Sequence, residues 1–173
     1  VINKGVVRHF SPLGDFKTEE WDRALAVNLS AGFHTAPLAL PGMRRRDFGR
    51  IVNIASVFGL FGTTNRVDYV TTKTALIGFT RAVALEVAEA GITVNAVCPG
   101  YVLTPLVEQQ IPATARTRGM DEAAVIRAVL PAAQPTTQFG TVGHVATRPA
   151  LAAPPSPAPL PSARPHHHRG QGP

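Results

Sequence analysis

Residues 50–56 (RIVNIAS) and residues 92–98 (ITVNAVC) decide the fold of this chain. Each is a short, nearly continuous apolar run, which is typical of a strand that is buried on both faces. Between them, Asp68–Ala90 has the periodicity of a helix, and we expect Gly91 to end it. A strand, a helix and a second strand in this order predict two parallel strands joined by a helical crossover.

A further helix is expected before the first strand. Thr18 and the two glutamates after it suit a helix N-terminus, and the apolar pattern runs from Trp21 to the three arginines at 44–46. We expect Pro37 and Pro41 to kink this helix or to end its regular part. The alternation of helices and strands therefore predicts an α/β fold with a parallel sheet covered by helices on both faces.

Composition excludes several classes of protein. The 173 residues are 45% hydrophobic and 16% charged, which fits a folded domain rather than a disordered chain. No apolar run is long enough to span a bilayer and no signal-peptide pattern opens the chain, so we expect a cytoplasmic protein. Cys98 is the only cysteine, and three adjacent histidines at 166–168 cannot preorganise a tetrahedral site, so no metal site is expected.

The basic charge is confined to one end of the chain. The formal charge of +6 and the pI near 10.4 suggest an anionic partner at first sight. All 11 acidic residues lie at or before Glu122, where the balance is only +2, and four arginines supply the rest. We therefore expect no nucleic-acid and no membrane partner. A tail that binds either of them is the minor alternative, and a salt-dependent affinity lost with residues 148–173 would support it.

The composition changes sharply near residue 148. Eight of the 16 prolines lie between Pro149 and Pro173, and such a segment favours polyproline II or disorder. We therefore expect a folded unit at 1–147 and a disordered tail at 148–173. The abrupt loss of acids motivates the hypothesis of a shifted reading frame at about residues 143–148. Translation of the gene in its other two frames tests this hypothesis.

Three chemically useful side chains follow the first predicted strand. In parallel sheets, ligands bind outside the carboxyl ends of the strands, so functional residues are expected just after Ser56 and just after Cys98. Tyr69 and Lys73 are four residues apart and share one helix face. An ordinary phenol has a pKa of about 10, and a nearby ammonium favours its ionised form. A hydroxyl, a phenol and an ammonium together suit proton transfer to a substrate oxygen.

Four segments in this order and spacing resemble the short-chain dehydrogenase/reductase family: Asn28-Leu29-Ser30, RIVNIAS at 50–56, Tyr69-x-x-x-Lys73 and VNAVCPG at 94–100. The resemblance extends from about residue 3 to about residue 143. It implies a Rossmann-type, doubly wound parallel sheet and hydride exchange between NAD or NADP and a carbonyl or alcohol carbon. Only the C-terminal half of that fold is expected in this chain.

The resemblance also implies roles for single residues. Ser56 orients the substrate oxygen, Tyr69 is the general acid/base, and Lys73 assists Tyr69 and holds the nicotinamide ribose. Asn28 supports a proton relay through water, although a polar residue at a bend of the helix is the plain alternative. The cofactor-binding residues implied are Asn3, Gly5, Tyr69, Lys73, Pro99, Gly100 and Thr104.

A closer resemblance is to bacterial D-3-hydroxybutyrate dehydrogenases, carried by residues 34–44, 53–57 and 98–107. It implies that D-3-hydroxybutyrate and acetoacetate are the substrates. The substrate-binding residues implied are Ser56, Arg66, Tyr101 and Gln110, with Arg66 in place of a lysine that binds a carboxylate. Phe58 stands where these enzymes carry histidine. A 3-oxoacyl carrier-protein reductase or another short-chain alcohol dehydrogenase is therefore the alternative.

No glycine-rich turn for the cofactor pyrophosphate occurs in this sequence, and the residue that selects NAD over NADP is absent with it. NAD is expected, and NADP is not excluded. We therefore expect little or no dehydrogenase activity from the 173-residue chain itself, and an inactive fragment is the second alternative. Micromolar NAD binding to this chain, measured by calorimetry, would overturn that alternative. Full-length members of the family are expected to form homotetramers.

Overall fold

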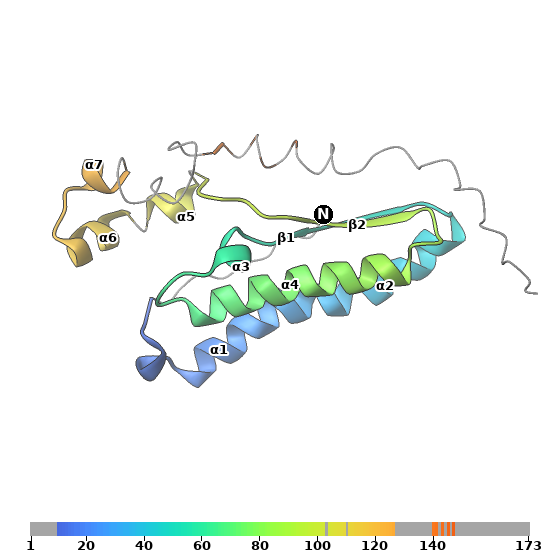
Figure 1. Ribbon diagram of the computed structural model, residues 1–173, viewed down its shortest axis with the longest axis horizontal. Helices are drawn as coiled ribbons and strands as arrows, with labels where there is room; N and C mark the ends of the chain where they lie inside the picture. The colour runs from blue at the N-terminus through green and yellow to red at the C-terminus, as the bar shows by residue number, and fades with distance from the viewer. Residues whose placement is uncertain are drawn as a thin grey trace, which may run out of the picture.

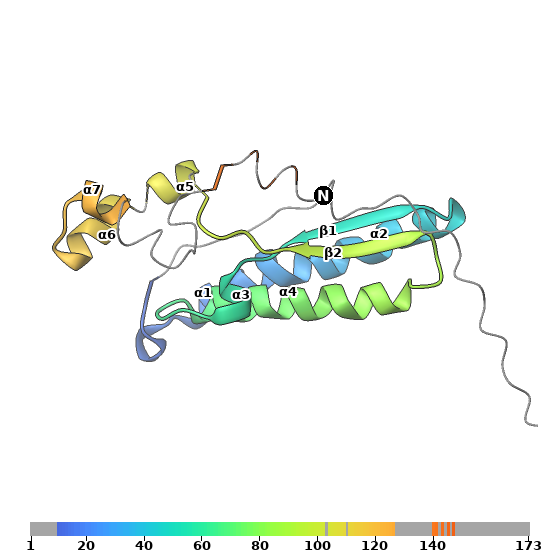
Figure 2. The same ribbon diagram turned by 45° about the horizontal axis from the view of Figure 1, so that its top comes forward.

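Two parallel strands form the centre of the structure, a computed structural model that describes residues 10–102, 104–109, 111–126, 140, 141, 143, 145 and 147. Strand β1 (Gly49–Ile54) pairs with β2 (Ile92–Val97), with Gly49 opposite Ile92 and Ile54 opposite Val97. Within the described residues the long helices lie on one face of this pair (Figure 1, Figure 2). The predicted α/β fold with parallel strands is confirmed.

The helix before β1 covers the residues that the sequence predicts, but it is less regular. After a short 3₁₀ turn η1 (Leu13–Asp15), helix α1 (Thr18–Leu25) passes through a π-helical segment η2 (Ala26–Ser30) into α2 (Ala31–Arg45). The prediction that prolines end the regular part is wrong, because α2 continues past both of them. Both prolines are exposed, so water can hydrate the carbonyls that lose their hydrogen bonds.

The crossover helix α4 (Val67–Glu86) ends four residues earlier than predicted. A turn at Val87–Gly91 connects it to β2, and Gly91 has a different role from the one expected. A Cβ built on Gly91 would overlap the main-chain oxygen of Asp47, and the Gly91 N–H donates a 2.6 Å hydrogen bond to Asp47 Oδ1. Gly91 is therefore needed for the close approach of two turns rather than for the end of the helix.

The apolar core lies between α4 and the strands. One cluster, made by Val83, Val87, Ile92 and Val94, lies toward the amino ends of the strands. A second cluster, made by Ala55, Leu76 and Ile77, lies toward their carboxyl ends. Burial of these side chains removes apolar surface from water, which is the main favourable term in folding. The core therefore fixes α4 against both strands.

Short helices gather at the carboxyl ends of the strands (Figure 1): α3 (Phe58–Phe61), α5 (Pro105–Glu108), α6 (Ile111–Arg118) and α7 (Glu122–Ala124). The N-terminal end of α4 lies at this same end of the sheet (Figure 2). Gly140 also lies at the carboxyl end of the sheet, because its N–H donates a hydrogen bond to the Tyr101 carbonyl at 2.9 Å. No helix in the described part of the chain is long and apolar enough to cross a bilayer.

Several sequence-based predictions fall outside the described residues. They concern Asn3, Gly5 and Gln110 as binding residues, and the tail at 148–173. The predicted division of the chain at residue 147 and the proposed shift of reading frame therefore remain predictions.

Candidate active site

The hydrogen bonds between β1 and β2 continue beyond the carboxyl ends of the two strands. The Ala55 N–H donates to the Val97 carbonyl at 2.7 Å, and the Val57 N–H donates to the Pro99 carbonyl at 3.0 Å. Ser56 lies between these two bonds and is 5% exposed. This pairing fixes the main chain on both sides of Ser56 without using its side chain.

The Ser56 hydroxyl is already oriented by its own loop. Its Oγ accepts a hydrogen bond of 3.2 Å from the Phe58 N–H, while the Ser56 carbonyl accepts one of 3.0 Å from the Gly59 N–H. A hydroxyl has one hydrogen to donate besides its two lone pairs. Ser56 can therefore donate that hydrogen to an oxygen placed beyond the strand ends.

Lys73 is a buried ammonium that has one hydrogen-bond acceptor within the described part of the chain. It is 3% exposed, its Nζ donates to the Ile54 carbonyl at 2.8 Å, and the same Nζ lies 5.7 Å from the centre of the Tyr69 ring. Burial lowers the pKa of Lys73 to about 8, and the nearby Cys98 thiol acts in the opposite direction. An ammonium has three donors, and Ile54 is the one acceptor that the described residues supply.

Close packing of α3 on α4 sets the distance between Ser56 and Lys73. A Cβ built on Gly59 would lie 2.8 Å from the Lys73 carbonyl carbon and 2.9 Å from its oxygen. The Thr74 hydroxyl donates to the Gly59 carbonyl at 3.0 Å. Gly59 thus lets the segment that begins at Ser56 lie directly on the main chain of α4. The sequence analysis missed this residue, because its signal is a spatial contact rather than a spacing.

Asn28 lies in the π-helical segment η2 and reaches α4 through a threonine. It is 3% exposed, and its Nδ2 donates to Thr72 Oγ1 at 3.3 Å. Thr72 is fully buried and its hydroxyl donates to the Tyr69 carbonyl at 3.1 Å. π-Helical insertions in helices are frequent at functional sites. Asn28 is therefore connected to the turn of α4 that carries Tyr69 and Lys73, and Thr72 is a residue that the sequence analysis missed.

Arg66 lies at the N-terminal end of α4 among aromatic rings. Its Cζ is 3.8 Å from the centre of the Phe10 ring and 5.9 Å from that of Phe58, and Phe58 packs edge-on against Tyr101 at 5.7 Å. Burial lowers the pKa of Arg66, while Tyr101, Tyr69 and then Asp68 act on it in the opposite direction. The structure therefore brings two predicted substrate residues, Arg66 and Tyr101, to the same ring, Phe58.

The segment after β2 contains three of the predicted cofactor residues. Pro99 and Gly100 come shortly after the strand, and the Pro99 carbonyl accepts the hydrogen bond from the Val57 N–H. Thr104 caps α5, because its Oγ1 accepts a 3.3 Å hydrogen bond from the Val107 N–H. The three residues thus lie in the loop that follows β2, near Ser56.

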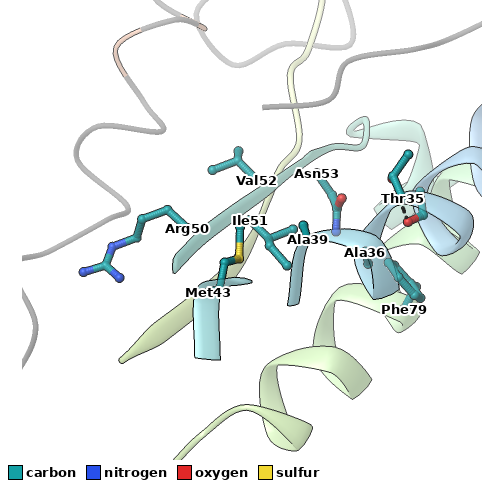
Figure 3. Close-up of a pocket in the computed structure, with 10 residues that line it drawn as sticks. Thr35, Ala36, Ala39, Met43, Arg50, Ile51, Val52, Asn53 and Phe79 are labelled. Carbon is teal, nitrogen blue, oxygen red and sulfur yellow. Dashed lines mark hydrogen bonds between the residues drawn. The ribbon is translucent and has the colours of Figure 1, made fainter. Parts of the chain in front are cut away.

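Figure 3 shows a cavity of about 230 Å³ that lies elsewhere, between α2 and β1. Small and apolar side chains such as Ala36, Ala39 and Ile51 line it, and Arg50 points away from it. None of Ser56, Tyr69 and Lys73 is among its lining residues. We therefore place the candidate site at the strand ends and not in this cavity. In the described part of the chain, no three metal-ligating side chains come together.

The donors at the strand ends fit the nicotinamide end of NAD or NADP. Two donors of the Lys73 ammonium have no acceptor among the described residues and would suit ribose hydroxyls, and the Tyr69 side chain lies next to them. Pro99, Gly100 and Thr104 are the described residues that would lie along the nicotinamide. Asn3 and Gly5, predicted for the same cofactor, lie outside the described residues.

Comparison with known proteins agrees with this geometry. The short chain dehydrogenase family profile matches residues 1–115. The chain is 51% identical over 147 residues to the D-beta-hydroxybutyrate dehydrogenase of Rhizobium meliloti, covering 85% of this chain and 57% of that protein. It is 43% identical over 141 residues to that of Cupriavidus necator, covering 82% and 55%.

A solved structure of an actinorhodin polyketide ketoreductase variant with NADPH superposes with a TM-score of 0.82 at 32% identity. The match covers 88% of this chain and 59% of the ketoreductase. The chain thus spans somewhat more than half the length of the relatives that it matches. Fold, sequence profile and identity all agree, and the chain belongs to the short-chain dehydrogenase family.

Proposed function

We propose that this protein exchanges a hydride between a nicotinamide cofactor and a small hydroxy or keto acid, namely D-3-hydroxybutyrate and acetoacetate. One observation carries the proposal. The buried Lys73 ammonium has one acceptor among the described residues and lies beside the Tyr69 ring at the strand ends. An incompletely satisfied buried charge costs stability, and such a charge is typical of a site where a ligand completes its hydrogen bonds.

Each residue has a defined task in the proposed reaction. When bound, the nicotinamide supplies the hydride acceptor or donor. During oxidation of the alcohol, the Tyr69 phenolate takes the proton of the substrate hydroxyl, while Ser56 donates a hydrogen bond to the same oxygen. The Lys73 ammonium, 5.7 Å from the centre of the Tyr69 ring, is proposed to hold the nicotinamide ribose beside Tyr69. Asn28 is proposed to connect this site to water, in agreement with its hydrogen bond to Thr72.

Arg66 is proposed to bind the substrate carboxylate. Its guanidinium lies within electrostatic reach of both Tyr69 and Tyr101, at the end of α4 where the substrate oxygen is expected. A guanidinium matches a carboxylate with two parallel hydrogen bonds. Tyr101 and Gln110 are proposed as further substrate residues, and Gln110 lies outside the described residues. The 51% identity to a D-beta-hydroxybutyrate dehydrogenase supports this substrate.

An alternative of the same class is the reduction of a 3-oxoacyl group on a carrier protein. It is supported by the aromatic surface of Phe58 and Tyr101 next to the site and by the similarity to a polyketide ketoreductase. An apolar wall suits an acyl chain better than it suits a carboxylate. For the cofactor we propose NAD, with NADP as the alternative.

The experiment is a spectrophotometric assay of the full-length gene product. We expect NADH to form from NAD and D-3-hydroxybutyrate, with little product from the L enantiomer and a lower kcat/KM with NADP. Reduction of a 3-oxoacyl thioester with a higher kcat/KM than acetoacetate would establish the alternative. Absence of turnover with every one of these pairs would refute the proposal. The same assay on the 173-residue chain tests whether that chain alone is active.

The assembly and location of the protein are part of the proposal. We propose a homotetramer in the cytoplasm, on the basis of the family to which the chain belongs. Light scattering of the purified gene product checks the first of these statements, and fractionation of the source cells checks the second.

A further inference from the structure

Phe10 covers one face of the Arg66 guanidinium at the outer edge of the site. The distance from Arg66 Cζ to the centre of the Phe10 ring is 3.8 Å, against 5.9 Å to the Phe58 ring on the inner side. Phe10 is 54% exposed, so it contributes little to the core. A ring in this position attracts the cation and restricts its movement.

The segment that carries Phe10 is fixed to the N-terminal end of α4. The Ser11 N–H donates to the Asn65 carbonyl at 3.1 Å, one residue before Arg66. On the inner side, Phe58 is held by its contact with Tyr101, with the two rings at 84°. Both rings near the guanidinium are therefore held by neighbouring parts of the fold, one from before α1 and one from α3.

A planar cation beside a ring leaves its N–H groups in the plane, at the edge of the stack. A carboxylate can accept two of those N–H groups side by side. Tyr101 and Tyr69 interact electrostatically with Arg66, so the guanidinium lies near both phenols at the proposed reacting end of the site. The arrangement thus selects a substrate with an anionic group close to its reacting carbon.

We infer that Phe10 is a positioning residue, which holds the Arg66 guanidinium in the orientation that binds the carboxylate of a short hydroxy or keto acid. This inference rests on the proposed function. It adds a residue from the segment before α1 to the substrate site. It also specifies that recognition of the carboxylate depends on the ring of Phe10 and not only on the charge of Arg66.

The test compares an acid with its uncharged ester. In the full-length gene product, Phe10→Leu should raise the KM for D-3-hydroxybutyrate about fivefold, the usual size of a cation–π contribution, and leave kcat nearly unchanged. The KM for the methyl ester should not change, because the ester has no charge to bind. Phe10→Tyr keeps the ring and should restore the KM for the acid.

Phe48→Leu is the matched control. Phe48 is 56% exposed, and the centre of its ring lies 4.5 Å from Arg50 Cζ. The same substitution therefore removes a similar ring–cation pair at the amino end of β1, away from the candidate site. This variant should not change the KM for the acid. Equal changes for acid and ester in Phe10→Leu, or no change for the acid, would overturn the inference while the proposed function stands.

A second measurement does not depend on turnover. Butyrate, which has the carboxylate but no oxidisable hydroxyl, is titrated into the wild type and Phe10→Leu while the arginine side-chain N–H signals are followed by NMR. We expect weaker binding in Phe10→Leu. Equal affinities, or no butyrate binding in the wild type, would refute the inference even if no dehydrogenase activity were found.

Discussion

The two ends of the β1–β2 pair are built from different kinds of contact. At the amino end, Val83, Val87 and Ile92 pack in an apolar cluster, and Gly91 allows two turns to meet through a main-chain contact. At the carboxyl end, buried polar side chains lie close together: Asn28, Ser56, Thr72 and Lys73. At the amino end the polar side chains of Asp47 and Arg50 bond to main-chain groups, whereas the carboxyl end holds a buried ammonium.

This difference separates the end of the sheet that is packed by apolar side chains from the end that carries the candidate site. Apolar burial and close main-chain packing stabilise the fold without further partners. A buried ammonium with one acceptor destabilises it, unless a ligand supplies further acceptors. Substitutions at the amino end should therefore change mainly stability, and those at the carboxyl end mainly catalysis.

The largest expected effect is at the carboxyl end. Tyr69→Phe removes the proposed acid/base and should lower kcat about 10³-fold, the middle of the range for such groups. The temperature of unfolding should not fall, because the ring remains. Steady-state kinetics and thermal unfolding of the full-length gene product check both statements. The matched control is Tyr101→Phe, which removes the other tyrosine hydroxyl and should cost far less. Equal losses in both variants would remove Tyr69 from its role.

Lys73→Met tests the cost of the buried ammonium. The folded-state pKa of Lys73 is about 8, against an unperturbed value of about 10.5. Between these values the unfolded state binds more protons, so the stability of the wild type rises with pH. Relative to Lys73→Met, the free energy of unfolding of the wild type should increase by up to about 3 kcal/mol from pH 7.5 to 10.5.

Chemical denaturation of both proteins across this pH range provides the measurement. Below pH 8 the wild type carries the full cost, so Lys73→Met should be the more stable protein there. A difference that stays constant with pH, or a wild type that loses stability relative to Lys73→Met as pH rises, would show that Lys73 is not buried as an ammonium.

Two glycines allow the same substitution at both ends. Gly59→Ala and Gly91→Ala each force a methyl group into main-chain atoms, and each should cost about 1–3 kcal/mol of stability. Gly59→Ala should also lower kcat about tenfold, because it shifts Ser56 relative to Lys73. Gly78→Ala on α4 has open space and is the control; it should not destabilise the protein. A loss of kcat in Gly91→Ala of equal size would contradict the comparison.

The smallest expected effects come from two helix caps. Thr104 Oγ1 accepts from the Val107 N–H at 3.3 Å, and Asp121 Oδ1 accepts from the Ala124 N–H at 2.6 Å. Replacing either cap by alanine should cost about 1 kcal/mol or less of stability. Only Thr104→Ala should also weaken cofactor binding, by a few-fold in Kd measured by calorimetry. Weaker cofactor binding in Asp121→Ala would remove Thr104 from the proposed cofactor site.

The two strands and the helix that carries Tyr69 and Lys73 were predictable from the sequence, because they depend on local pattern. The apolar runs at 50–56 and 92–98 and the spacing of Tyr69 and Lys73 give a parallel pair with both side chains at one helix end. The tertiary details were not predictable. The sequence shows neither the π-helical turn at Asn28 nor the contact of Gly59 with the main chain of Lys73.

The errors of the sequence analysis have the same cause. The expectation that Pro37 and Pro41 could end the regular part of α2 is wrong, because the helix continues on an exposed side where water replaces the lost hydrogen bonds. The alternative, a kink, stays a prediction. Gly91 looked like the end of a helix, but its role is set by Asp47, a residue 44 positions away. The contact of Phe10 with Arg66 likewise joins segments that only the fold brings together.

The most direct test of the central claim follows the hydrogen itself. D-3-Hydroxybutyrate deuterated at carbon 3 is incubated with NAD and the full-length gene product, and the nicotinamide is analysed by mass spectrometry. We predict one deuterium per nicotinamide reduced, and no transfer with Tyr69→Phe in the same time. Reduced cofactor without deuterium, or equal transfer in the Tyr69→Phe variant, would contradict the account of the carboxyl end as a hydride-transfer site.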